Sequence, residues 1–398
     1  MAVIDTIREK QTLTACTDQA MPANALSWEQ ACTFWKGRAA LYAVLKALQV
    51  GEGDTVLVPG YTCFAVPSAV MFTGAKPAFV DIDRHTFNIS LQAIRETYQL
   101  CASRVKAVIV QHTYGIPADI RPILNWAYQN GIAVIEDCAH SWGSRYRDGR
   151  EWKPLGSFGD AAIFSSQWTK PASTGLGGWA ITNDTSLRTR LRQFRQDECV
   201  PPSAGETALL AAQVCARELA SLPAFYWTSK RLYQFLYTRG LLVGTSSPEE
   251  FQAKMPKGYA KRMSSFQEWL LNRRLDHVEI LDQRRSLRAK YDAMLAGSGF
   301  STLKTPENSD PVLLRYPLRV QNKNRVMGEA RRRGIELGDW YNHPIDVPEP
   351  SMAERFGYRE GVCPEGERAA KEVINLPMQA NVTEKQILRI AKLLKEVA

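Results

Sequence analysis

The sequence predicts an α/β protein in which helices cover both faces of a mostly parallel β-sheet. Short apolar runs alternate with helical stretches from about residue 36 to residue 183. This alternation is typical of parallel sheets, because their strands are connected through helices. Mixed elements near the C-terminus predict a second, smaller α+β domain. Ligands of parallel sheets bind at the carboxyl ends of strands, so functional residues are expected there.

The elements of the sheet are identified by their apolar patterns. In GRAALYAVLKAL the apolar residues recur at helical spacing, which predicts a helix that begins at Gly37. A second helix is predicted over residues 120–129. The predicted strands are residues 55–60, 78–82, 105–111, 132–136, 161–164 and 178–182.

The chain after residue 183 is predicted to be mainly helical up to residue 245. Prolines interrupt this region near Pro201-Pro202 and at Pro223, where helices are expected to break. From Ser264 to about Leu295 the pattern predicts one long charged helix. We expect this helix to bridge the two domains.

The C-terminal domain is predicted to contain one strand and two helices. The strand is VLLRYPLRV, one helix covers residues 323–333, and the last helix begins at Glu384. The predicted boundaries are a large domain over residues 1–265 and the bridging helix with the small domain over residues 266–398. A helical insertion at about residues 197–256 interrupts the large domain.

The charge of the chain suits an anionic ligand without identifying it. The 398 residues carry 50 Lys and Arg against 41 Asp and Glu, a net charge of +9 that is spread along the chain. A phosphorylated sugar, a nucleotide, nucleic acid or an acidic membrane surface would each suit this surplus.

The cysteines and the N-terminus indicate a reducing compartment. The eight cysteines are scattered, without the paired spacing of a zinc site or a redox motif, so we expect free thiols and no metal site. The first residues, MAVIDTIREKQ, lack the apolar core of a secretory signal, and no apolar run is long enough to span a membrane. A cytoplasmic location is therefore predicted.

Two segments place polar side chains at strand ends. In IAVIEDCAH an apolar run leads to Glu136, Asp137 and His140. Alone, such a segment is most often a strand followed by a polar loop. The stretch AIFSSQWTKPASTGLGGWAITND then places Ser165 and Lys170 between two predicted strands. A loop lysine is usually a surface charge, but Lys170 lies among aromatic, proline and glycine residues, which is unusual for one.

These residues supply the parts that pyridoxal phosphate (PLP) chemistry requires. They are a lysine amine for a Schiff base, a carboxylate against the pyridine nitrogen, and donors for the phosphate. An adjacent carboxylate favours the protonated ring nitrogen, which makes the ring an electron sink. The helix that begins at Gly37 and the hydroxyl of Ser165 could bind the phosphate. By itself, Gly37 is better explained as an ordinary helix start.

With these residues assembled, the chain resembles the DegT/StrS family of sugar aminotransferases, which have the fold-type I PLP-dependent transferase fold. The resemblance runs from about Trp35 to the C-terminus, interrupted by the helical segment at about residues 197–256. It rests on GRAALYAVLKAL, GDTVLVPGYT, GAKPAFVDID, VQHTYGIPADI, VIEDCAHSWGS, the FSxxxTK run, RMS and VINLPM, in this order. It implies a large domain with a seven-stranded type of sheet. The implied activity is amino transfer, usually from glutamate, to a keto group of a nucleotide-linked sugar.

The resemblance also implies roles for single residues. Lys170 corresponds to the Schiff-base lysine and Asp137 to the partner of the pyridine nitrogen. His140 lies where the family has Gln or His beside the ring, and Ser165 at the phosphate-binding serine. Gly37-Arg38-Ala39 occupies the phosphate-loop position. A homodimer and small-molecule substrates are implied as well, and no nucleic-acid partner.

Three positions depart from the family pattern. Arg38 stands where the family usually has Thr, so a guanidinium would replace a hydroxyl. The aromatic residue that commonly stacks on the cofactor corresponds to Cys63, although Phe64 is adjacent and could take its place. The asparagine that family dimers usually donate to the neighbouring phosphate corresponds to Ala260.

Residues 221–244, SLPAFYWTSKRLYQFLYTRGLLVG, combine many aromatic residues with basic ones. We predict a helix packed on the protein itself or on a partner subunit. The alternative is an interfacial helix that makes peripheral contact with a membrane. The segment is too charged to span a bilayer.

Two other functions compete with amino transfer. One is a PLP-dependent sugar dehydratase, and the other is a non-catalytic sugar-binding or regulatory member of the family. The dehydratase branch replaces the Schiff-base lysine with histidine, whereas Lys170 is retained here. A binding protein would not need the Lys170 and Asp137 pair, so aminotransferase is the favoured hypothesis.

Overall fold

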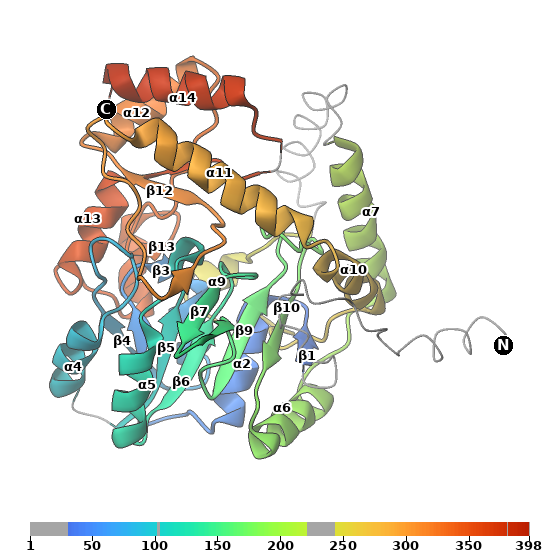
Figure 1. The fold of residues 1–398 in the computed structure, drawn as a ribbon. Coiled ribbons are helices and arrows are strands. Elements are labelled where there is room, and N and C mark those ends of the chain that lie inside the picture. The colour runs from blue at the N-terminus through green and yellow to red at the C-terminus, as the bar shows by residue number, and fades with distance from the viewer. Residues whose placement is uncertain (1–30, 102–103, 221–242, 380, 398) are drawn as a thin grey trace.

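The computed structural model describes residues 31–101, 104–220, 243–379 and 381–397. It confirms the α/β class, with a seven-stranded central sheet in the order β1-β10-β9-β6-β5-β2-β4 (Figure 1). The five strands from β9 to β4 run parallel, and β10 is antiparallel to both of its neighbours. In sheet order the strands are β1 (Ala31–Phe34), β10 (Gly178–Ile181), β9 (Ala161–Ser165), β6 (Ala133–Asp137), β5 (Arg104–Gln111), β2 (Asp54–Pro59) and β4 (Lys76–Val80).

Helices cover both faces of this sheet because its strands are apolar on both sides. Val56 and Val58 of β2 lie in one buried core, and Leu57 between them lies in the other. This is the alternation that a pleated strand imposes. The first core packs α2 (Gly37–Ala47), α3 (Ala65–Met71) and α6 (Thr185–Asp197), and the second packs α4 (Leu91–Leu100) and α5 (Ile120–Gln129).

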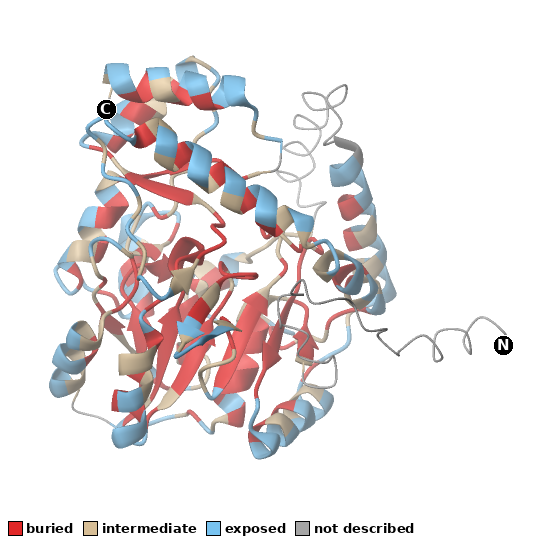
Figure 2. Cartoon of the chain, in the orientation of Figure 1, coloured by how far each residue is buried: buried red, intermediate tan, exposed pale blue. Residues whose placement is uncertain are grey.

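The C-terminal part builds a third core around a short two-stranded sheet. Here β12 (Tyr316–Arg319) pairs antiparallel with β14 (Val373–Leu376). The strand expected in VLLRYPLRV and the two expected helices are thus present. Exposed faces of the long helices point outward, and their buried faces meet this core (Figure 2). The helices of this part are α11 (Glu279–Leu295), α12 (Lys323–Arg332), α13 (Pro364–Glu372) and α14 (Glu384–Val397).

The long helix predicted from Ser264 to Leu295 is wrong, because the chain forms two helices. They are α10 (Ser265–Leu275) and α11, separated at residues 276–278. Leu271 of α10 packs in the second core of the central sheet, whereas Tyr291 of α11 packs in the C-terminal core. The start of α11 still contacts the second core through Leu281, and the rest of the helix turns to the C-terminal core.

Between residues 184 and 251 the described chain is mainly helical. Helices α6 and α7 (Ala204–Ala220) lie on either side of Pro201-Pro202, as predicted, and α9 (Pro248–Phe251) is short. Residues 221–242, which include most of the aromatic segment, lie outside the described residues.

None of the helices within the described ranges is long and apolar enough to cross a membrane. The seven cysteines in these ranges are free thiols.

Several short elements were not predicted. Strands β7 (Arg145–Asp148) and β8 (Glu151–Pro154) form a hairpin extended by β11 (Ser309–Asp310), and all three are rich in polar residues. Near the C-terminal part, β3 (Thr62–Cys63) pairs with β13 (Ile345–Asp346), and η2 (Pro350–Phe356) follows. Pairs this short carry no periodic signal in the sequence.

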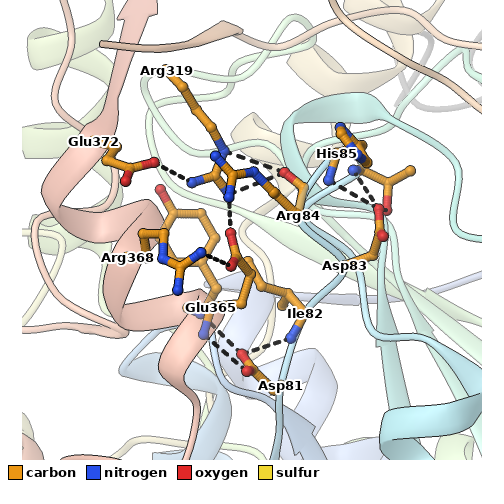
Figure 3. A network of polar contacts seen from close by, with 12 residues as sticks. Asp81, Ile82, Asp83, Arg84, His85, Arg319, Glu365, Arg368 and Glu372 are labelled. Atoms are coloured by element: carbon orange, nitrogen blue, oxygen red, sulfur yellow. Dashed lines mark hydrogen bonds and ion pairs between the residues drawn. The ribbon is translucent and has the colours of Figure 1, made fainter. Parts of the chain in front are cut away.

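A polar network joins the loop after β4 to the C-terminal part (Figure 3). Arg319 of β12 forms ion pairs with Glu365 at 2.6 Å and Glu372 at 2.7 Å, and it also donates to the backbone oxygen of Arg84. The carboxylate of Asp81 accepts two backbone N–H groups from the first turn of α13, at 2.9 Å each. These contacts hold α13 and β12 against the central sheet.

Candidate active site

A cavity of about 120 Å³ lies where β6 and β9 end and α2 begins. This position agrees with the general rule for parallel sheets. Seven of the predicted site residues line it, and the C-terminal part contributes Trp340, Tyr341 and Asp346. The polar and aromatic lining is Lys36, Gly37, Arg38, Cys63, Gln111, Asp137, His140, Ser165, Gln167, Lys170, Thr245, Trp340, Tyr341 and Asp346.

Lys170 lies in the loop after β9 and is buried. Its Nζ is 5.2 Å from the centroid of the Trp340 ring. Burial lowers the pKa of this amine to about 7, although the negative charge of Asp137 acts in the opposite direction. Near neutral pH a large fraction of Lys170 is therefore unprotonated, which is the form that attacks an aldehyde.

Asp137 and Glu136 are adjacent on β6 and point to opposite faces. Asp137 is buried and lines the cavity, where its Oδ1 accepts the backbone N–H of Ala139 at 2.9 Å. Burial raises the pKa of this carboxyl, and the nearby Lys170 opposes the shift. Glu136 does not line the cavity and instead binds the backbone of residues 156–159. Only Asp137 is placed for chemistry beside Lys170.

His140 follows β6 and is held in a defined orientation. Its Nδ1 accepts the backbone N–H of Tyr114 at 3.2 Å, and its Nε2 lies 3.4 Å from the Oη of Tyr341. The ring stacks against Trp340 with centroids 5.7 Å apart. Burial lowers the pKa of His140 well below its usual value, so the imidazole is neutral.

The start of α2 approaches the ends of β9 and β10 closely. A Cβ at Gly178 would lie 2.3 Å from the Cα of Gly37, and a Cβ at Gly37 would lie 3.1 Å from the Cβ of Ser165. The contact at Gly178 excludes any side chain, and a side chain at Gly37 would fit only if Ser165 shifted by a few tenths of an ångström. No side chain caps the helix at Lys36, so the first N–H groups of α2 face the cavity beside Ser165. A helix start of this kind binds anions.

Arg38 and Ala39 take different positions at this helix start. The Arg38 guanidinium forms an ion pair with the buried Glu250, donates to Ser246 Oγ at 3.1 Å and lies over the ring of Phe64. Its charge is thus partly balanced within the protein. Ala39 is buried in the first core and does not line the cavity.

Phe64 does not take the place of an aromatic residue at Cys63. Cys63 lines the cavity, whereas Phe64 packs on Phe251 and Phe356 with centroids 4.9 and 5.6 Å away. The aromatic ring beside Lys170 is that of Trp340 instead. Ala260 is buried in the first core of its own chain.

The sequence did not identify the residues from the C-terminal part. Trp340, Tyr341 and Asp346 reach the cavity because β13 pairs in parallel with β3, which brings Asp346 opposite Cys63. Burial raises the pKa of Asp346 to about 6. The adjacent aromatic residues in GDWYNHPID are the one signal that could have pointed to this segment.

Comparison with known proteins agrees with this geometry. The profile of the DegT/DnrJ/EryC1/StrS aminotransferase family matches residues 23–211 and 232–395, most of the chain. The chain belongs to this family. The cofactor of the family is PLP, and the cavity fits it: a buried amine lies near a buried carboxylate, and an uncapped helix start faces the same space. The protein is therefore a PLP-dependent aminotransferase.

Relatives of this family member include both enzymes and a regulatory protein. A UDP-N-acetyl-3-dehydro-alpha-D-glucosamine 3-aminotransferase of Acidithiobacillus ferrooxidans is 28% identical over 90% of this chain and 82% of its own length. A protein of Geobacillus stearothermophilus named pleiotropic regulatory protein is 29% identical over 88% of this chain and 80% of its own. The solved structure of DesV from S. venezuelae is 25% identical, with a TM-score of 0.72 over 99% of this chain and 92% of that one.

Proposed function

We propose that this aminotransferase moves an amino group from glutamate to a keto group of a nucleotide-linked sugar. The observation that carries the proposal is the buried pair of Lys170 and Asp137 in a cavity that also faces the start of α2. The names of relatives support the substrate class, since one acts on a UDP-linked keto sugar. PLP, when bound, supplies the electron sink for this exchange.

Each residue of the cavity has a proposed role. Lys170 binds the cofactor through its amine and, when the substrate amine displaces it, moves a proton at the reacting carbon. Asp137 keeps the pyridine nitrogen protonated by its negative charge. His140 lines the cavity and would lie beside the cofactor ring. Ser165 and the backbone at Gly37-Arg38-Ala39 bind the phosphate.

A second cavity gives room for a substrate larger than the cofactor. It has a volume of about 770 Å³ and shares Arg38, Cys63, Trp340 and Asp346 with the first. Its lining also includes the buried Lys323 and the exposed Lys371. Positive charge at this opening suits the phosphates of a nucleotide-linked sugar.

The experiment for this proposal is a screen of keto nucleotide-sugars with glutamate, in which 2-oxoglutarate release is measured. Amino transfer releases 2-oxoglutarate, whereas a dehydratase consumes the sugar without it and a binding protein does neither. Borohydride reduction of the holoenzyme and peptide mapping should place the phosphopyridoxyl group on Lys170. A label on any other lysine would contradict the site, and Lys170→Ala should abolish both the label and turnover.

We also propose that the enzyme is a homodimer with its cavities near the subunit boundary. The family resemblance of the RMS segment supports this assembly. Sedimentation velocity should give twice the chain mass, and a monomer would contradict it.

Peripheral membrane contact through residues 221–244 stays a prediction, since residues 221–242 lie outside the described structure. Binding to anionic vesicles that is lost at high salt would support it.

A further inference from the structure

The backbone at Trp340 and Tyr341 is fixed by a relay of phenol groups. The N–H of Tyr341 donates to Tyr61 Oη at 3.1 Å, and Tyr61 Oη lies 2.8 Å from Tyr114 Oη. Tyr114 donates its own hydrogen to the backbone oxygen of Trp340. Because the Tyr114 hydrogen is used in this way, Tyr114 Oη accepts the hydroxyl hydrogen of Tyr61. The chain of hydrogen bonds thus leads from the N–H of Tyr341 through both phenols to the carbonyl oxygen of Trp340. The relay holds the backbone of Tyr341 in place without using the Tyr341 hydroxyl.

The hydrogen of the Tyr341 hydroxyl can be placed from the tautomer of His140. Nδ1 of His140 accepts the backbone N–H of Tyr114, so this nitrogen carries no hydrogen. The neutral ring then has its hydrogen on Nε2, which donates to Tyr341 Oη. Tyr341 is the acceptor in this contact, so its own hydrogen must point elsewhere.

The hydrogen of Tyr341 has no acceptor within the described part of the chain. His140 is the one hydrogen-bond partner of Tyr341 Oη in those residues. The side chain is buried, with 2% exposure, and it lines the cavity that contains Lys170. Burial raises the pKa of Tyr341 well above its usual value, so the phenol stays protonated. A buried donor without an acceptor is costly unless a ligand satisfies it.

We propose that Tyr341 is a binding residue of this cavity that donates its phenol hydrogen to a negatively polarised oxygen held beside Lys170. The proposal rests on the proposed function. Two oxygens have the required chemistry: the ring oxygen of the bound cofactor and the keto oxygen of the sugar. His140 acts as a positioning residue, because its Nε2–H keeps the Tyr341 hydrogen directed into the cavity.

The test is Tyr341→Phe, which removes the hydroxyl and keeps the ring. A donor to the ring oxygen stabilises its ionised form, so the absorbance titration of the holoenzyme without substrate should shift upward by about one pH unit. A donor to the sugar oxygen should leave this titration unchanged and lower kcat/KM for the keto sugar by about 10- to 100-fold. Either result supports the proposal and identifies the oxygen.

Tyr291→Phe is the matched control, because Tyr291 is also a buried phenol but donates to the backbone oxygen of Pro377 outside the cavity. It should change neither readout. Thermal unfolding checks that both variants fold, and Tyr341→Met replaces Tyr341→Phe if the latter does not. No change in either readout overturns the proposal. If the wild-type enzyme transfers no amino group to a keto sugar, the proposed function fails. The ring oxygen of the cofactor is then the one remaining acceptor, so an unchanged titration of the Tyr341→Phe holoenzyme overturns the role of Tyr341 separately.

Discussion

Replacing Glu136 with glutamine should destabilise the protein and leave the chemistry of the cavity intact. The Glu136 side chain is fully buried and accepts four hydrogen bonds. Oε1 binds the N–H groups of Phe158 and Gly159 at 2.7 and 2.8 Å, and Oε2 binds Gly156 N–H at 2.8 Å and His112 Nε2 at 3.1 Å.

The amide of glutamine can replace only half of these contacts. Its oxygen can keep two donors, but its NH₂ group then faces the other two. His112 cannot adapt by moving its hydrogen, because its Nδ1 accepts the N–H of Ala118 at 3.0 Å. Two hydrogen bonds to a charged group are lost, at about 1.5–3 kcal/mol each, so the free energy of unfolding should fall by about 3–6 kcal/mol. That is a large share of the total stability of a typical protein, about 5–15 kcal/mol.

Urea unfolding of the apo-protein measures this effect. Glu151→Gln, on the exposed side of β8, is the matched control and should change the free energy of unfolding by less than about 0.5 kcal/mol. Where Glu136→Gln still folds, borohydride reduction of its holoenzyme should place the phosphopyridoxyl group on Lys170, as in the wild type. A loss below about 1 kcal/mol for Glu136→Gln would refute the assignment of Glu136 as a structural acceptor.

Three further predictions follow from the same structure. Asp137→Asn should keep the covalent attachment at Lys170 but lower turnover at least about 100-fold, because a neutral amide no longer favours the protonated ring; normal turnover would contradict this. The rate at which apo-protein combines with PLP should rise about tenfold per pH unit up to about pH 7 and then level off, since burial lowers the Lys170 pKa to about 7 and only the free amine reacts. A stopped-flow pH profile without a bend near pH 7 would contradict it. Arg319→Ala should lower the free energy of unfolding by about 2 kcal/mol, because Glu372 loses its ion-pair partner and Glu365 keeps Arg368 but loses Arg319. The exposed Arg331→Ala is its control in urea unfolding.

The sequence predicted the central sheet well because its strands are apolar runs bounded by polar turns. The helix over residues 120–129 has the predicted limits, and the six predicted strands agree to within two residues, whereas the edge strand β1 was not predicted. Asp137, His140, Ser165 and Lys170 could be found for a related reason. Asp137 and Ser165 are the last residues of β6 and β9, and His140 and Lys170 follow these strands. Because parallel strands end at the same edge of the sheet, all four come together.

The rest of the site depends on contacts between distant parts of the chain. The ion pair of Arg38 and Glu250 and the approach of Trp340 to Lys170 have no local signal. The break in the predicted long helix is a tertiary effect too, because the buried residues of this region are divided between two cores. The proposed domain boundary at residue 265 and the cytoplasmic location stay predictions.

The pairing of β3 with β13 has a consequence for how the enzyme is made. Asp346 lies opposite Cys63, so one wall of the cavity comes from a segment that leaves the ribosome long after the sheet has been synthesised. N-terminal regions of a chain fold first during synthesis. The nascent sheet can therefore present Lys170 and Asp137 before Trp340 and Tyr341 cover them. Tight retention of PLP should report that the whole chain, through β13, has folded.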